Sequence, residues 1–156
     1  MEINWFLLIG LIVICNLIGS LGVIWTSSDR GWYNNIEKPS FNPPSWIFGP
    51  VWTLLFSLMG IALYLVWIAP ASNIKAIALI FFGLQFVLNI LWSYLFFGIN
   101  NPLFSLVEIF VLLFFILITG IYFYFVNRFA GYLLIPYFLW VIFASFLNYS
   151  IWNLNK

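Results

Sequence analysis

The chain has 156 residues, of which 65% are hydrophobic and 6% are charged, and its formal net charge is +1. Soluble domains carry about 25% charged residues, so this chain has too few charges to cover a surface in water, and most of it must be solvated by lipid. It also lacks the basic footprint of a nucleic-acid-binding protein. The composition therefore excludes a soluble domain and a nucleic-acid partner.

The apolar stretches of the chain have the length of membrane-spanning helices. About 20 apolar helical residues cross the hydrocarbon core of a bilayer, which is roughly 30 Å thick. Long uninterrupted apolar runs favour helices over the short alternating strands of a β-barrel. We therefore predict an all-α integral membrane protein in which residues 1–156 form one five-helix transmembrane bundle. The predicted helices lie at residues 4–25, 45–69, 74–97, 103–125 and 129–152.

Five crossings divide the basic residues between the two sides of the membrane. Lys75 and Arg128 fall on the side of the N-terminus, and the other basic residues fall on the opposite side. Basic residues favour the cytoplasm, so the C-terminus and the loop at residues 26–44 are predicted to be cytoplasmic, in the cell membrane if the source is a bacterium. The residues on this side are Arg30, Lys38 and Lys156.

The loop at residues 26–44 is longer than the other predicted loops and is rich in charged and aromatic residues. Pro43 and Pro44 stiffen it, and Asn42 is predicted to cap the helix that follows. A long ordered loop is more often functional than a plain connector, so we predict a lid over a binding site, with a connector as the alternative. The charged and aromatic residues are Asp29, Arg30, Trp32, Tyr33, Glu37, Lys38 and Phe41.

Polar and amphipathic side chains gather at one depth of the membrane, in the half next to this loop. Such side chains are costly in lipid and usually face the bundle interior or a wet cavity, so we predict a pocket beneath the loop. The alternative is that they form interhelical hydrogen bonds, worth about 1 kcal/mol each. The residues at this depth, from different predicted helices, are Trp52, Asn89, Trp92, Glu108, Asn148 and Tyr149.

Helical spacing places several of these residues on shared faces. Residues at i, i+4 and i+7 lie on one face of a helix, as do Gln85, Asn89 and Trp92. A stripe of small residues on the first predicted helix indicates close helix packing. Glu108 is the single acid inside a predicted helix, and either a binding role or a place near the headgroups fits it. The other sets are Trp140, Ala144, Asn148 and Ile151, and Cys15, Gly19, Gly22 and Thr26.

The tryptophans fall into two groups. Those near the predicted helix ends suit the interfacial aromatic belt, whereas Trp52, Trp92 and Trp140 lie deeper. Large flat side chains beside a few amides suit a flat, mainly apolar ligand.

Ordered motifs along nearly the whole chain resemble those of one known family. Residues 32–33, 38–46 and 49–53 read WY, KPSFNPPSW and GPVWT; further on come Gln85, Asn89 and Trp92, then FFG at residues 96–98. Residues 136–137 read PY, and Trp140, FA at 143–144 and LNY at 147–149 complete the set. Together they resemble the translocator-protein family, also called the tryptophan-rich sensory proteins or peripheral benzodiazepine receptors.

The resemblance implies a five-helix bundle that binds porphyrins, sterols or benzodiazepine-type drugs in a pocket under the first loop. It also links Trp52 and Trp140 to light- and oxygen-dependent breakdown of porphyrin. Two departures are Phe41, where many relatives have tryptophan, and Asn153, where animal members have a basic residue of a proposed cholesterol motif. The resemblance implicates Trp52, Trp92, Trp140, Ala144 and Leu147 as lining residues, and depth or motif adds Trp32, Asn89, Glu108 and Asn148.

The chain has no histidine, which is the commonest of the usual haem ligands. Cys15, Met1 and Met59 are poor candidates for an axial ligand. We therefore expect no metal site and no required cofactor. Protoporphyrin IX or haem would bind as a ligand by stacking and apolar burial. Its propionates would pair with cations of the loop, namely Arg30 and Lys38.

Three classes of function remain to be separated. The leading one is a membrane receptor or translocator in tetrapyrrole sensing, scavenging or transport. The second is an enzyme, for which only photo-oxidative porphyrin degradation at Trp52 and Trp140 is open, because no triad, metal cluster or phosphate-binding loop is present. A channel or transporter fits less well, since the chain lacks an inverted repeat. The expected partners are small hydrophobic ligands, membrane lipid and a second copy in a homodimer.

Overall fold

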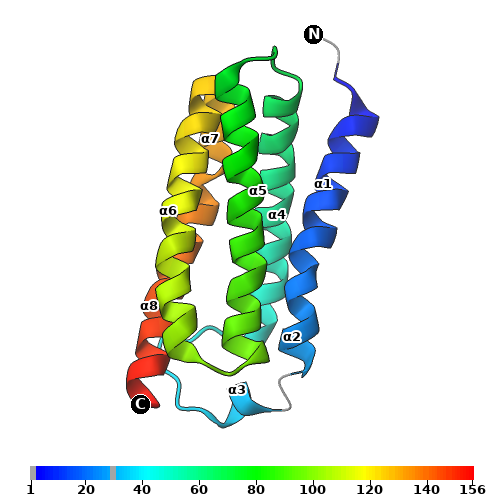
Figure 1. Ribbon diagram of the computed structural model, residues 1–156. Coiled ribbons are helices and arrows are strands. Elements are labelled where there is room, and N and C mark those ends of the chain that lie inside the picture. The colour runs from blue at the N-terminus through cyan, green and yellow to red at the C-terminus, as the bar shows by residue number, and fades with distance from the viewer. Residues whose placement is uncertain (1–2, 29–30) are drawn as a thin grey trace.

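The computed structural model describes residues 3–28 and 31–156, and in this part of the chain helices are the regular structure (Figure 1). Five helical segments of this part are long and apolar enough to span a membrane. The prediction of an all-α membrane protein with a five-helix bundle is confirmed. The spans are Trp5–Thr26, Ser45–Trp67, Asn73–Gly98, Pro102–Val126 and Arg128–Leu154.

The first span changes its neighbour partway along. It consists of α1 (Trp5–Gly19), the 3₁₀ turn η1 (Ser20–Gly22) and α2 (Val23–Ser28). The Asn4 side chain caps α1 by accepting a hydrogen bond from the Leu7 amide at 3.1 Å. α1 packs along α4 (Ser45–Trp67), whereas α2 packs mainly against the end of the third span. The tighter η1 turn therefore redirects the chain across the bundle.

The start of α4 differs from the prediction that Asn42 caps it. Pro44 occupies the N-cap position, in an extended conformation with φ −56° and ψ 140°. Two prolines separate Asn42 from Ser45, so the asparagine lies too far from the first turn to cap it. Its side-chain oxygen instead accepts a hydrogen bond from the Tyr33 hydroxyl at 3.0 Å.

The third span ends in a wider turn than the predicted regular helix. α5 (Asn73–Ser93) continues into the π-helical turn η2 (Tyr94–Gly98), where the Ile99 amide donates to the Tyr94 carbonyl at 3.0 Å. Single π turns within helices are frequent at functional sites. This one lies at the end of the bundle that carries the long loop.

The fourth and fifth spans run from α6 (Pro102–Val126) through α7 (Arg128–Leu133) to α8 (Ile135–Leu154). Asparagines cap α6 and α7, since Asn101 accepts from the Phe104 amide and Asn127 accepts from the Phe129 amide. The predicted single helix at residues 129–152 is interrupted at Leu134. Pro136 has no amide hydrogen to donate to the carbonyl four residues earlier, and its ring crowds that carbonyl.

The two halves of the bundle are packed differently. In the half away from the long loop, side chains fill the interior: Met59, Val66, Ala78 and Phe123 are completely buried, and Phe82 stacks on Phe123 at 5.4 Å. The long loop, including the short helix α3 (Trp32–Asn35), crosses beneath the other end (Figure 1). The half away from the loop is therefore tightly filled by side chains around these buried residues.

Candidate ligand pocket

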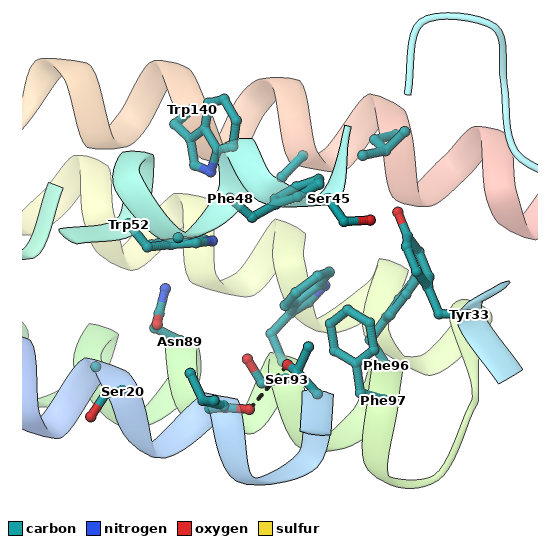
Figure 2. Close-up of a pocket in the computed structure, with 18 of the residues that line it drawn as sticks. Ser20, Tyr33, Ser45, Phe48, Trp52, Asn89, Ser93, Phe96, Phe97 and Trp140 are labelled. Atoms are coloured by element: carbon teal, nitrogen blue, oxygen red, sulfur yellow. Dashed lines mark hydrogen bonds between the residues drawn. The ribbon is translucent and has the colours of Figure 1, made fainter. Parts of the chain in front are cut away.

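A cavity of about 660 Å³ occupies the half of the bundle next to the long loop. This size falls within the usual range for small-molecule sites, about 300–1,000 Å³. Its lining comes from the first span, α4, the third span, α8 and the loop, and α6 supplies no lining residue. Figure 2 shows Phe48, Trp52 and Trp140 on one side of the cavity, opposite Asn89, Ser93 and Phe97.

Aromatic rings form most of the wall, and they hold one another in place. Trp52 stacks on Phe56 with ring centroids 5.3 Å apart, and Trp92 stacks on Phe96 at 5.1 Å. Trp140 meets Phe48 edge to face at 6.0 Å. Contacts of this kind add about 0.5–1.5 kcal/mol each beyond the area that they bury, so the wall is a set of fixed flat surfaces.

The polar groups of the wall are tied to neighbouring helices. The Trp92 indole donates to the Asn148 side-chain oxygen at 3.0 Å, and the Asn148 amide donates to the Pro102 carbonyl at 2.8 Å. The Asn89 amide donates to the Tyr137 hydroxyl at 3.1 Å, which in turn donates to Gln85 at 2.9 Å. Asn89 and Asn148 thus join helices and line the cavity at once, so the two predicted roles coexist.

Gly31, Tyr33 and Asn34 of the loop form the end of the cavity. Gly31 has φ +89°, in the left-handed region that favours glycine, and α3 follows directly. The Tyr33 ring packs against Phe97 at 5.5 Å. Burial raises the pKa of the Tyr33 phenol, and its hydrogen bond with Asn42 opposes part of that rise, so the hydroxyl stays protonated and donating at neutral pH.

The sequence of this chain is similar to those of known proteins over most of its length. The model of the TspO/MBR family matches residues 11–153. The chain belongs to the TspO/MBR family. It is 46% identical over 139 residues to the tryptophan-rich protein TspO of Archaeoglobus fulgidus, covering 88% of this chain and 90% of that protein.

Two more distant relatives extend the likeness. The tryptophan-rich sensory protein of Cereibacter sphaeroides is 32% identical over 155 residues, covering 99% of this chain and 95% of its own length. The translocator protein of Homo sapiens is 37% identical over 127 residues, covering 80% and 75%. Together with the five spans, these names support a membrane receptor or translocator role for this TspO/MBR protein, which is an integral, multi-pass membrane protein.

The structure gathers most of the predicted site residues of this TspO/MBR chain around the cavity. They come from three helices and converge although the chain separates them by dozens of positions. The predicted residues that line the cavity are Trp52, Asn89, Trp92, Trp140, Ala144, Leu147 and Asn148.

Other predicted residues lie elsewhere. Trp32 packs behind the wall, 5.5 Å from the Phe96 ring. The Lys38 ammonium lies 4.7 Å above the Tyr33 ring and bonds the Asn34 carbonyl at 3.5 Å, so it points along the loop and does not line the cavity. Arg30 lies outside the described residues.

Glu108 belongs to α6 and is 7% exposed, but it does not line the cavity. Neither of its carboxyl oxygens has a hydrogen-bond partner among the described residues. Within the same part of the chain, no three His, Cys, Asp or Glu side chains cluster as metal ligands would.

Sequence reasoning missed the contribution of the first span and of several phenylalanines. The small residues Gly19, Gly22 and Thr26, predicted to serve helix packing, line the cavity as well. The signal was present, because small side chains that let helices approach also leave room for a ligand. Four phenylalanines also line the cavity, and their depth does not distinguish them from phenylalanines that face lipid: Phe48, Phe56, Phe96 and Phe97.

Proposed function

We propose that the protein binds porphyrins in this cavity, as a membrane receptor or carrier of tetrapyrroles. The observation that carries the proposal is the aromatic wall, in which Trp52, Trp92 and Trp140 border a space of about 660 Å³ whose lining surface is mainly apolar. A porphyrin is flat and apolar over both faces and carries its charges at one edge. Sterols and benzodiazepine-type drugs share the apolar body and are the secondary ligands.

The wall suggests how the ligand is held. The chain contains no histidine, so the macrocycle is retained by stacking and by burial of its faces, and not by an axial bond from that side chain. Its propionates are directed to the loop, whose cations are Arg30 and Lys38. To reach a propionate, Lys38 must rotate its ammonium away from the Tyr33 ring.

Titration of tryptophan fluorescence tests the proposal. Purified protein in nanodiscs should show saturable quenching by protoporphyrin IX. Trp52→Phe should reduce both the quenching and the affinity. Trp46→Phe is the matched control, because Trp46 is 74% exposed and does not line the cavity. Quenching that does not saturate, or that is equal in both variants, would reject the cavity as the porphyrin site.

The absence of histidine also predicts the metal preference. Zinc, iron and metal-free protoporphyrin should bind within about tenfold of one another, a spread of roughly 1.4 kcal/mol. The same titration with each porphyrin measures this spread. A strong preference for iron, with a shift of the Soret band, would instead reveal an axial ligand, for which a tyrosine is the first candidate.

A second candidate function is photo-oxidative degradation of the bound porphyrin. It is favoured by the position of Trp52 and Trp140 on the cavity wall, where indole rings can donate electrons to a light-excited macrocycle while dioxygen serves as the oxidant. Loss of the porphyrin absorbance under light and air, compared with dark and anaerobic samples, separates turnover from binding.

A further inference from the structure

The contact between the first span and α4 is closed in the half of the bundle away from the loop. A Cβ atom on Gly60 would lie 2.6 Å from the Ile12 Cα, so the two backbones nearly touch there. One turn closer to the loop, the Asn16 side chain donates to the Ser57 hydroxyl at 3.1 Å. Each of these pairs joins α1 directly to α4 and leaves no path between them.

One turn further towards the loop, the two helices are no longer joined by such a contact. Because the two helices are antiparallel, Ser20 follows Asn16 by one turn, and Thr53 precedes Ser57 by one turn. Ser20 and Thr53 both line the cavity, and both are exposed. Val23, which is 56% exposed, and the exposed Gly49 continue the same pattern towards the loop. These residues line the cavity and are not covered by neighbouring side chains, as expected at an opening in its wall.

The change of neighbour at η1 explains why the contact opens here. Gly22 lies against Ser93, since a Cβ on this glycine would be 2.7 Å from the serine hydroxyl. Trp25 meets Tyr94 edge to face at 5.5 Å. α2 is thus held on the third span, and the first two turns of α4 are left without a close neighbour on that side.

The edge of the opening suits an apolar molecule. The Ser20 hydroxyl donates to the Leu17 carbonyl at 2.7 Å, and the Thr53 hydroxyl donates to the Gly49 carbonyl at 3.0 Å. With these donors satisfied within their own helices, neither hydroxyl group needs water or a polar partner from a passing ligand.

In contrast, the part of the loop at residues 31–44 is fastened to the helices. The Glu37 amide donates to the Asn155 side-chain oxygen at 3.0 Å, and the Asn155 amide donates back to the Glu37 carbonyl at 2.9 Å. This pair fastens the loop to the end of α8. The Tyr33–Asn42 hydrogen bond and the Tyr33 ring contacts with Phe96 and Phe97 fasten it further. A ligand arriving from water past residues 31–44 would have to break these contacts.

We propose that the ligand reaches the cavity sideways from the bilayer, through a lateral portal bounded by Ser20, Val23, Gly49 and Thr53. The ligand class is accordingly a flat apolar molecule that is already dissolved in lipid, and the loop acts as a fixed floor to the site. This proposal takes the identity of the ligand from the proposed function. It adds that the ligand enters from the bilayer and not from water.

Two glycines offer a matched test. A Cβ on Gly49 or on Gly83 would meet no atom within 4 Å, and both residues are exposed within helices. Gly49 borders the portal, whereas Gly83 lies on α5 away from the cavity. Stopped-flow quenching in nanodiscs, with protoporphyrin IX and with a neutral isoquinoline-carboxamide, gives the association and dissociation rates for Gly49→Leu and Gly83→Leu.

A bulkier side chain in the portal raises the barrier in both directions. We expect Gly49→Leu to slow association and dissociation of both probes by about tenfold each, an added barrier of roughly 1.4 kcal/mol, while Gly83→Leu keeps the wild-type rates. Asn155→Ala, which removes the hydrogen bonds between the loop and α8 and so loosens the loop, should leave the association rate unchanged.

Three outcomes would overturn the portal while leaving the proposed function intact. They are unchanged rates in Gly49→Leu, equal slowing in Gly83→Leu, and faster association in Asn155→Ala, which would make the loop the route. Failure of the wild-type protein to bind either probe would overturn the proposed function itself, and the portal with it.

Discussion

At the scale of single residues, the tryptophans show how far depth and spacing carry a prediction. Trp52, Trp92 and Trp140 lie too deep for the interfacial belt, and all of them line the cavity. Trp32 was predicted from motif position and packs outside the wall, because a sequence gives the place of a loop residue without the direction of its side chain. Glu108 lies at the predicted depth but does not line the cavity, because the depth of a residue in the membrane does not determine which side of its helix the side chain is on.

Trp140 gives the sharpest test of the chemistry at this scale. Trp140→Phe should fold and still bind protoporphyrin IX, because phenylalanine retains an aromatic ring against Phe48 and Phe143. Photodegradation should fall sharply, since the benzene ring is a much poorer electron donor than indole. The measurement is the decay of porphyrin absorbance under light. A decay rate equal to that of wild type would remove Trp140 from the reaction, and Trp46→Phe controls for loss of an indole outside the cavity.

At the scale of elements, hydropathy locates the spans well and their irregularities poorly. Apolar runs predict where helices cross the membrane, because each run must satisfy its backbone hydrogen bonds internally in lipid. The η1 turn, the π turn at Tyr94–Gly98 and the break at Leu134 depend on packing between helices and on Pro136. Residues of the η1 and π turns line the cavity, so the spans could be predicted from the sequence and the contour of the site could not.

Gly60 lets α1 and α4 approach each other closely. Gly60→Ala should destabilise the protein by about 1–3 kcal/mol, the usual range for overpacking, because the new methyl group would meet the Ile12 backbone. Gly10→Ala on α1 is the control, since a Cβ there meets nothing within 4 Å, and alanine favours a helix over glycine by about 1 kcal/mol. Thermal unfolding in detergent measures both. Equal melting temperatures for the two variants would show that the helices separate freely.

The loop as an element carries an electrostatic prediction. Arg30→Gln together with Lys38→Gln should weaken protoporphyrin IX binding a few-fold, because each exposed pair with a propionate contributes about 0.2–1 kcal/mol. Raising the salt concentration should reproduce the loss by screening. A neutral isoquinoline-carboxamide should respond to neither change, and titrations of both ligands provide the measurement. Equal weakening of the two ligands would indicate a deformed loop and no electrostatic role.

At the scale of the whole molecule, the odd number of spans separates the two ends of the chain. The N- and C-termini lie at opposite ends of the bundle, and the C-terminus lies at the end with the long loop (Figure 1). The cavity is therefore close to one face of the membrane. The face is predicted from a small excess of basic residues, three against two. The positive-inside rule behind this prediction is a statistical preference of loops, and no contact inside the bundle encodes the orientation.

Fusion reporters test this orientation. Green fluorescent protein joined after Lys156 should fluoresce in a bacterial host, because the C-terminus is predicted to be cytoplasmic and exported green fluorescent protein does not mature. Alkaline phosphatase at the same position should be inactive, since it requires the periplasm. The reverse pair of results would place the loop and the cavity on the outer side of the membrane.

The π turn at Tyr94–Gly98 has a consequence for insertions and deletions in this chain. A π turn accommodates one residue more than an α-helical turn, and each residue of an α-helix advances the side-chain direction by about 100°. Removing one residue here would let the π turn become a regular α-helical turn. The residues after it would then be rotated about the helix axis. Phe96, now 2% exposed and stacked on Trp92, would then face a different neighbour. Length changes at this turn therefore reshape the cavity while the span itself stays intact.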